Sequence, residues 1–254
     1  MKVQILGCGT STGVPKIGNQ WGRCDPAEPR NRRLRSSILV ESGGERLLVD
    51  CGPDLRQQLL SADVGQLEAV MVTHSHGDHV HGIDDLRPLA AALGRPIPLY
   101  GRRQTLEALE RSFAYAFARS DFYRPIVAPN LLGESMAFGD MTIRTVDQPH
   151  GDMWSVGLRF DQAGGSIGYA VDFSDFTADM AALYEGVDVW IADCLTREPH
   201  PTHFHLDGLL SVAREIGVGQ LYLTHMGNGL DYRTLVAELP DWAAPAHDGL
   251  ELHL

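Results

Sequence analysis

Short apolar segments alternate with segments of helical periodicity along this chain. Strands are predicted at Val3–Leu6, Ser37–Val40, Arg46–Val49, Leu67–Thr73, Ile97–Tyr100, Met141–Val146, Val156–Phe160, Ile167–Val171, Val187–Ala192, Gln220–Thr224 and Gly249–Leu252. Helices are predicted at Pro53–Leu60, Gln104–Ala118, Phe176–Glu185, Leu206–Ile216 and Tyr232–Leu239. Both halves run from strands to helices, which predicts an α/β fold with two sheets face to face and helices outside, a four-layer αββα sandwich. No low-complexity linker separates the halves, so we expect one domain over residues 1–254.

The composition narrows the class of protein. With 254 residues, 44% of them apolar, the chain can bury a full core. Its 21 Lys and Arg against 33 Asp and Glu give a net charge of −12, which matches long nucleic acids poorly. The cysteines Cys8, Cys24, Cys51 and Cys194 are far apart, which favours free thiols in a reducing compartment. Without a signal-peptide core or a membrane-length apolar run, a soluble cytoplasmic protein with no membrane partner is expected. The oligomeric state stays open, with a homodimer among the alternatives.

The segment His74-Ser75-His76-Gly77-Asp78-His79 directly follows the predicted strand Leu67–Thr73. Three imidazoles and a carboxylate within six residues suit zinc and, less selectively, manganese or iron. The alternative is a polar surface turn that is rich in histidine. Gly77 and Gly82 favour the metal site, because they give the backbone freedom to fold around an ion.

Three further candidate ligands also fall at strand ends. His150 follows the strand Met141–Val146 after a short turn, Asp172 closes Ile167–Val171, and His225 closes Gln220–Thr224. A lone histidine is usually a satisfied or solvated residue. Three candidates at corresponding points indicate one site, because α/β architectures gather function at the carboxyl ends of their strands.

The order of these residues resembles the metallo-β-lactamase superfamily, with its His-x-His-x-Asp-His motif and downstream ligands. Asp50-Cys51-Gly52 is similar to the first motif of that family. The resemblance implies an αββα sandwich with two divalent metal ions, zinc or manganese, between the sheets. It implies that one ion is held by His74, His76 and His150 and the other by Asp78, His79 and His225, with Asp172 bridging and Asp50 supporting the site.

Such a pair of ions can lower the pKa of a water between them and stabilise an anionic transition state, so no Ser or Cys nucleophile is required. Asp78 can accept a proton from the nucleophile. Asp78 is therefore both a ligand and a catalytic candidate.

Two other features concern the substrate. Residues 30–37 hold four arginines, and Arg32, Arg33 and Arg35 are candidates for binding a phosphate through guanidinium hydrogen bonds. The alternative is a solvated turn. His203 and His205 precede the predicted helix Leu206–Ile216, where a histidine can protonate a leaving oxygen.

This pattern is similar to the phosphoribosyl cyclic phosphate phosphodiesterases and, more distantly, to the tRNA 3′-processing endonucleases. The resemblance makes His203 the additional catalytic histidine, with His205 a close rival. The phosphodiesterases also carry a cysteine cluster and a second histidine that form a structural zinc site. Here only Cys24 lies in that region and Asn228 stands in place of the histidine, so a third, structural zinc is not expected.

The sequence therefore predicts a dinuclear-metal phosphodiesterase that acts on a small phosphodiester, cyclic or linear, such as a phosphoribosyl cyclic phosphate or a nucleotide. A tRNA endonuclease is the first alternative, but the chain is acidic and has no long basic arm. Lactone or thioester hydrolases share the metal site but leave the arginines and His203 unexplained. A nucleotide-binding scaffold without catalysis is the non-enzymatic alternative.

The sequence leaves the roles of two loops undecided. The Gly7–Gly13 loop lacks the spacing of a nucleotide-binding motif, so we expect a tight loop that borders a site. Residues 114–130, with Phe113 before them, are rich in aromatic residues and contain Pro125 and Pro129. They predict either core packing or a lid over the substrate.

Overall fold

Two seven-stranded sheets form the centre of the protein in the computed structural model, which describes residues 1–254. The first sheet has the strand order β14 (Glu251–His253), β1 (Lys2–Gly7), β2 (Ser37–Ser42), β3 (Glu45–Val49), β4 (Ala69–Met71), β5 (Ile97–Gly101) and β6 (Val127–Leu131). The second has the order β13 (Ala243–Pro245), β12 (Gln220–Thr224), β11 (Val189–Asp193), β10 (Gly165–Ala170), β9 (Met153–Gln162), β8 (Met141–His150) and β7 (Ser135–Phe138). In each sheet an antiparallel part continues into four parallel strands, β3 to β6 and β10 to β13.

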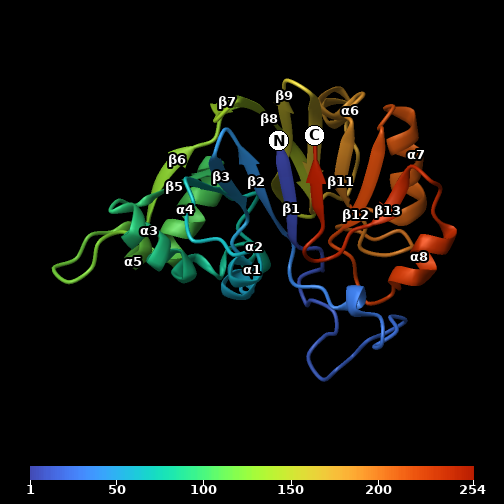
Figure 1. Ribbon diagram of the computed structural model, residues 1–254, viewed down its shortest axis with the longest axis horizontal. Coiled ribbons are helices and arrows are strands. Elements are labelled where there is room, and N and C mark those ends of the chain that lie inside the picture. The colour runs from blue at the N-terminus through green and yellow to red at the C-terminus, as the bar shows by residue number, and fades with distance from the viewer.

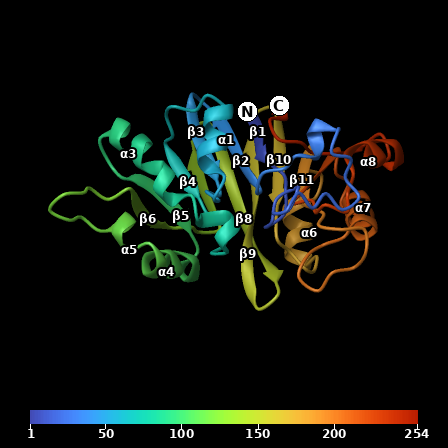
Figure 2. The same ribbon diagram turned by 90° about the horizontal axis from the view of Figure 1, so that it is seen from below.

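Helices lie on the outer sides of the two sheets (Figures 1 and 2). Beside the first sheet are α1 (Leu55–Ser61), α2 (Gly77–Val80), α3 (Arg87–Leu93), α4 (Arg103–Ser112) and α5 (Ala114–Phe117). Beside the second are α6 (Ala178–Tyr184), α7 (Leu206–Glu215) and α8 (Tyr232–Glu238). Two 3-10 turns lie at Pro29–Asn31 and Ile83–Leu86. The predicted αββα sandwich is confirmed. No helix has the length and apolar character needed to cross a bilayer.

The strand pattern places side chains in two separate hydrophobic clusters. A cluster of 41 buried residues joins the facing sides of both sheets and the helices of the second half. A cluster of 21 buried residues lies between the first sheet and its own helices. Strand β2 shows the cause: Ile38 and Val40 belong to the first cluster and Leu39 to the second, because successive strand residues point to opposite faces.

The chain leaves several of these strands in a left-handed backbone conformation. Asp50 after β3, Asp172 after β10 and His225 after β12 have φ angles of 64°, 55° and 54°. Such angles are uncommon for residues other than glycine and cost about 1–3 kcal/mol each. Three of the five non-glycine residues with positive φ thus lie at strand ends of the candidate site, and the other two, Asn19 and Asp63, lie in turns.

Some elements differ from the prediction. The edge strands β6 and β13 contain Pro129 and Pro245, which hide the strand pattern but are tolerated at an edge. Helix α3 was not predicted, although Pro88 in its first turn and the left-handed Gly94 at its end are typical helix boundaries. The predicted helix Gln104–Ala118 is split at Phe113, whose backbone is not helical (φ −126°, ψ 37°). Strand β7 was also not predicted.

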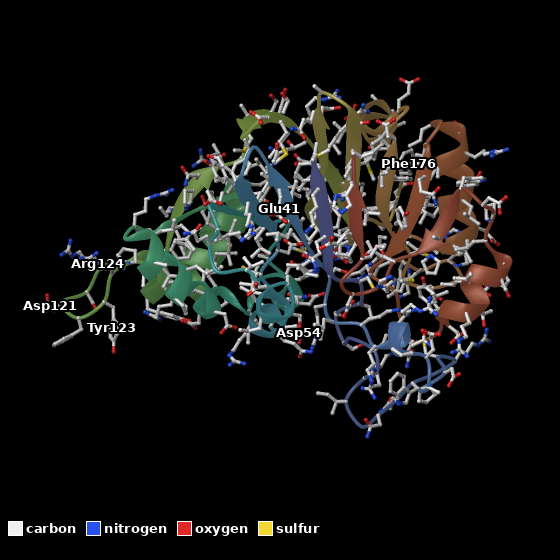
Figure 3. All side chains as sticks on the ribbon, in the orientation of Figure 1. Glu41, Asp54, Asp121, Tyr123, Arg124 and Phe176 are labelled. Carbon is white, nitrogen blue, oxygen red and sulfur yellow. The ribbon has the colours of Figure 1, made fainter.

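The aromatic segment over residues 114–130 is part core and part exposed loop. Phe113 and Phe117 pack against the smaller hydrophobic cluster. The loop that follows α5 extends away from the body of the protein, and Tyr123 lies near its tip (Figures 1 and 3). Phe122 and Tyr123 are 89% and 65% exposed.

Candidate metal centre

The candidate ligands come from both halves of the sandwich and meet at one edge of it. His74 and His76 lie between β4 and α2, and Asp78 and His79 lie in the first turn of α2. His150 ends β8, His225 directly follows β12, and Asp172 lies two residues after the end of β10. Strand ends thus position His150, Asp172 and His225, whereas the segment from β4 through α2 carries the other four ligands.

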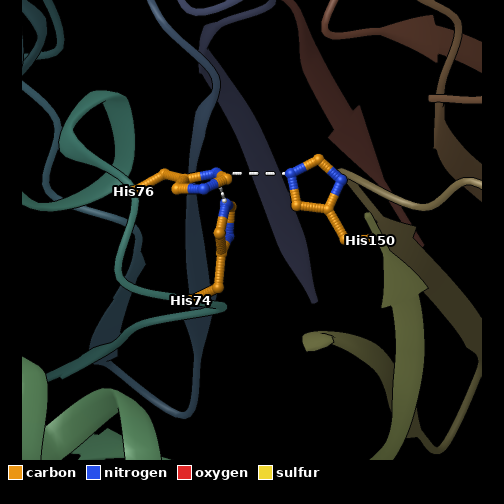
Figure 4. A group of neighbouring side chains, drawn as sticks. All are labelled: His74, His76 and His150. Carbon is orange, nitrogen blue, oxygen red and sulfur yellow. Dashed lines mark hydrogen bonds between the residues drawn. The ribbon is translucent and has the colours of Figure 1, made fainter. Parts of the chain in front are cut away.

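The first group consists of His74, His76 and His150 (Figure 4). His76 Nδ1 lies 3.0 Å from His74 Nε2 and 3.3 Å from His150 Nε2. Ligand atoms of a tetrahedral zinc ion with bonds of about 2.0 Å are about 3.3 Å apart. Two of the three spacings therefore match one face of a zinc site, and all three nitrogens lie within 4.8 Å of one another.

The second group consists of Asp78, His79, Asp172 and His225. Asp78 Oδ2 lies 3.2 Å from His79 Nε2 and 3.6 Å from His225 Nε2, and Asp172 Oδ1 lies 3.4 Å from His225 Nε2. The ligand atoms of this group all lie within 4.8 Å of one another. Two imidazoles and two carboxylates are a donor set that suits zinc and manganese.

Asp172 connects the two groups. Its Oδ2 lies 2.6 Å from His79 Nε2 in the second group and 3.7 Å from His74 Nε2 in the first. The side chain is 2% exposed. This carboxylate is thus the one that can contact cations in both groups.

Several buried atoms at the centre lack hydrogen-bond partners. His79 Nε2, His225 Nε2 and Asp172 Oδ2 are buried without one, although the first and third lie close together. A buried polar atom without a partner is costly and therefore rare. A divalent cation would satisfy all three, so the residues present fit a metal.

For two of the imidazoles, those of His79 and His150, another group holds the nitrogen on the opposite side of the ring. His79 Nδ1 lies 2.7 Å from Asp50 Oδ2, and the same carboxylate accepts a hydrogen bond from the amide of Thr73 at 2.8 Å. His150 Nδ1 lies 2.8 Å from the carbonyl oxygen of Thr202. These contacts favour the tautomers that leave Nε2 free for an ion. Sequence reasoning proposed Asp50 but missed Thr73 and Thr202.

The carboxylates around the second group also favour a bound cation. Burial disfavours the charged form of His79, but the carboxylates of Asp50, Asp172 and Asp78 outweigh it and raise its pKa well above the usual range. For His225, burial is likewise outweighed by Asp172 and Asp78, and its pKa rises to about 9. A divalent ion would supply the same positive charge in place of these protons, because ligands bind metal in their deprotonated form.

His203 lies beside this centre, and Asp193 orients it. His203 Nδ1 is 2.9 Å from Asp193 Oδ2 and 3.2 Å from Asp172 Oδ1. Asp193 ends β11 and is fully buried. Sequence reasoning missed Asp193, although a carboxylate at the end of an apolar strand was the signal that identified Asp172. His205 lies at the start of α7, where its backbone pairs with Thr196.

A cavity of about 660 Å³ opens onto both ligand groups. It is lined by Ser11, His76, Asp78, His150, Gly151, Asp152, Met153, Asp172, Pro201, Thr202, His203 and His225. Ser11 brings the glycine-rich loop to the edge of the site. His205 is not among the lining residues, and neither is any residue of the aromatic segment 114–130. In this conformation that segment does not act as a lid.

The candidate phosphate-binding arginines do not line the cavity either. Arg33 is 2% exposed, and its guanidinium donates to the carbonyl oxygens of Leu230 (2.7 Å) and Gly227 (3.2 Å). Arg35 Nη1 contacts Asp54 at 3.1 Å. Arg32 is exposed and lies 4.9 Å from the ring of Trp21. The geometry contradicts a substrate contact for Arg33, because its donors face the interior.

Comparison with known proteins identifies the family. The family model described as the beta-lactamase superfamily domain matches residues 45–226. The chain belongs to this superfamily. The match spans the segment from β3 to the last candidate ligand, His225.

Relatives of several names align with most of the chain. A Porphyromonas gingivalis octanoyltransferase is 29% identical over 99% of this chain, but the alignment covers 51% of the relative, so this chain spans about half its length. The metallo-hydrolase YhfI of Bacillus subtilis is 24% identical over 89% of this chain and 87% of its own. A ribonuclease Z of Mycobacterium bovis is 27% identical over 89% of this chain and 92% of its own.

Solved structures show the same fold. A diphosphatase of the PhnP family has a TM-score of 0.89 and 33% identity, over 99% of this chain and 96% of its own. Zinc-bound PqqB of Methylobacterium extorquens has a TM-score of 0.82 at 22% identity, over the full length of both chains, and shows similarity of fold alone. The chain thus has the metallo-β-lactamase fold, and its His and Asp clusters support divalent-metal binding.

Proposed function

We propose that this protein is a metal-dependent hydrolase and, more specifically, a dinuclear-metal phosphodiesterase that cleaves a small phosphodiester. The observation that carries the proposal is that both ligand groups, linked by Asp172, share a cavity of about 660 Å³ with His203. A cavity of this size suits a nucleotide-sized molecule. Two ions of zinc or manganese fit the donor sets of the two groups.

The named relatives support chemistry at phosphorus. The names diphosphatase and ribonuclease Z both describe enzymes that cleave bonds to phosphorus. The name octanoyltransferase belongs to a relative about twice as long, and it keeps an acyl substrate as the alternative to test. The absence of Lys and Arg from the cavity lining favours a small substrate over a tRNA.

Each residue has a role that follows from its position. When bound, two divalent ions supply Lewis acidity that acidifies water and stabilises an anionic transition state. The Asp78 side chain is 13% exposed, against 2% for Asp172, so it is the ligand carboxylate that can accept a proton at the cavity. His203 Nδ1 is engaged by Asp193, which leaves Nε2 to donate a proton to the leaving oxygen. His205 has no such contact, so we assign proton donation to His203.

A hydrolysis panel tests the proposal. The purified protein is assayed with bis(p-nitrophenyl) phosphate, 2′,3′- and 3′,5′-cyclic AMP, ribose 1,2-cyclic phosphate, a precursor tRNA, a lactone and an octanoyl thioester. We expect at least one small phosphodiester to react tenfold or more faster than the lactone or thioester, with about two metal ions per chain. The activity should be lost on chelation and in Asp172→Ala, which ties it to this centre.

Other outcomes would point elsewhere. Faster hydrolysis of the lactone or the thioester would indicate an acyl hydrolase with the same metal centre instead of a phosphodiesterase. Efficient cleavage of the tRNA alone would favour a nuclease. Full activity without metal would contradict the proposal as a whole.

A further inference from the structure

The cavity beside the metal centre carries no lysine or arginine. Its ionisable lining consists of four histidines and three carboxylates, Asp78, Asp152 and Asp172. Two of the carboxylates belong to the candidate ligands, and the ions they hold would face the scissile phosphate. Apart from His203, which serves the leaving oxygen, a second anionic group on the same substrate would meet no side chain that can carry a positive charge free of the ligand groups.

Asp152 differs from the other two carboxylates because it is exposed and not engaged. It lies in the two-residue turn Gly151–Asp152 between β8 and β9, next to His150. No ion pair or hydrogen bond holds its carboxylate, and the residue lines the cavity, so it adds an uncompensated negative charge there. Nothing in the catalytic proposal uses this residue.

The turn that carries Asp152 is fixed in place. Gly151 has a φ of +56°, and a Cβ there would lie 3.2 Å from Thr202 Cγ2. The carbonyl oxygen of Thr202 also contacts His150 Nδ1 at 2.8 Å. The turn is therefore packed against the loop that leads to His203, and Asp152 keeps its place on the cavity wall.

The arginine that contacts the cavity residue Ser11 is already engaged. Arg35 Nε donates to the carbonyl oxygen of Ser11, a cavity residue, at 3.1 Å. Its Nη1 lies 3.1 Å and 3.2 Å from the two carboxylate oxygens of Asp54. Asp54 thus offsets the charge that Arg35 could offer to a second phosphate.

We propose that Asp152 selects phosphodiesters whose only negative charge is the diester itself. The inference rests on the proposed phosphodiesterase function and deepens it. A substrate with a second phosphate would place that group near Asp152 without a compensating cation, and like charges at close range disfavour binding. A substrate that ends in hydroxyl groups meets a hydrogen-bond acceptor instead. The substrate class is therefore a phosphodiester of an otherwise unphosphorylated sugar or nucleoside, which excludes the phosphoribosyl cyclic phosphate that the sequence resemblance implies.

Matched substrate pairs test this selectivity. We would compare kcat/KM for adenosine 2′,3′-cyclic phosphate with that of its 5′-phosphate, and for ribose 1,2-cyclic phosphate with that of its 5-phosphate. We expect the unphosphorylated member to react at least tenfold faster in the pair that the enzyme accepts. The ratio should fall as ionic strength rises, because salt screens exposed charges.

Asp152→Asn separates charge from shape. The amide keeps an oxygen that accepts a hydrogen bond, so kcat/KM for the unphosphorylated substrate should change less than threefold. The kcat/KM for the phosphorylated substrate should rise about fivefold or more. Asp121→Asn is the matched control, because it removes the same charge from the exposed loop far from the site and should leave the ratio unchanged (Figure 3).

Three results would overturn the inference. A preference for the phosphorylated substrates would contradict it, and loss of that preference in Arg35→Ala would assign the second phosphate to Arg35. An equal change of the ratio in Asp152→Asn and Asp121→Asn would reduce the effect to net charge. If no phosphodiester of either kind reacted, the proposed function itself would fail and the inference with it.

Discussion

The metal centre and the arginine-rich segment over residues 30–36 both bury ionisable side chains, but they differ in whether the buried atoms have hydrogen-bond partners. In the centre, His79 Nε2, His225 Nε2 and Asp172 Oδ2 are buried without hydrogen-bond partners. In the segment, the buried guanidinium of Arg33 donates to two backbone carbonyls and to Asn31, and only its Nε lacks a partner.

The carboxylate of Glu28 extends the contrast. Its side chain is 1% exposed and lies 2.6 Å from both Arg30 Nε and Arg233 Nε. Charged groups that satisfy one another in this way hold a loop without regular structure against the rest of the protein. Buried nitrogen and oxygen atoms that lie close together without hydrogen-bond partners need a bound ligand, such as a metal ion, to satisfy them. The difference separates a structural network from a functional site, although both are rich in charge.

The strongest test of this contrast is Asp172→Ala. Because Asp172 contacts both ligand groups, its loss should remove at least one metal ion per chain and lower kcat by about 10³-fold or more. Elemental analysis and steady-state kinetics measure the two effects. Full metal content with near-normal turnover would exclude Asp172 from the centre.

Removal of the imidazole in His203→Ala should lower kcat by about 10²-fold and leave the metal content unchanged, because His203 donates a proton and is not a ligand. The loss should shrink with p-nitrophenolate as the leaving group, which departs without a proton. His205→Ala is the matched control and should cost less. A larger, leaving-group-dependent loss in His205→Ala would reverse the assignment.

On the structural side of the contrast, Arg33→Met should lower the free energy of unfolding by about 2–4 kcal/mol, because it leaves the carbonyls of Gly227 and Leu230 without donors. The exposed Arg32→Ala should change it by less than about 0.5 kcal/mol. Urea unfolding at equal metal loading measures both. Equal, small effects would show that the Arg33 network is not structural.

The two regions also differ in how far the sequence predicts them. His74, Asp172 and His225 directly follow strands that the apolar pattern predicts, so the sequence shows that they lie at strand ends. Asp193 carried the same signal and was missed because no family motif drew attention to it. Residues 8–36 have little regular structure, so no period shows which arginine points inward. Arg33 was therefore grouped with Arg32 and Arg35 as a phosphate ligand.

The aromatic segment shows the same limit at the surface. Its composition fits both core and lid, and the choice depends on where the chain leaves α5. Phe117 faces the smaller cluster, whereas Phe122 lies at the protruding loop. Edge strands such as β6 are equally hard to predict, since their pairing has one side only and tolerates Pro129.

The smallest expected effect is that of a substitution at Asp50. The carboxylate of this residue is hydrogen-bonded, as in the arginine-rich segment, yet it orients His79, whose Nε2 has no hydrogen-bond partner. Its carboxylate accepts from the amide and hydroxyl of Thr73 and contacts His79 Nδ1. In Asp50→Asn one of these donors would face the amide NH₂ group. We expect metal affinity to fall about 10- to 100-fold.

Competition with a chromophoric chelator measures that affinity, and kcat is then compared at saturating metal. Because Asp50 orients His79 and does not face the cavity, kcat should return to within about threefold of the parent protein once the ions are bound. Thr73→Val removes a hydroxyl from the same carboxylate and should have a smaller effect on affinity. A low kcat that persists at full metal loading would show that Asp50 takes part in the reaction itself and does more than orient His79.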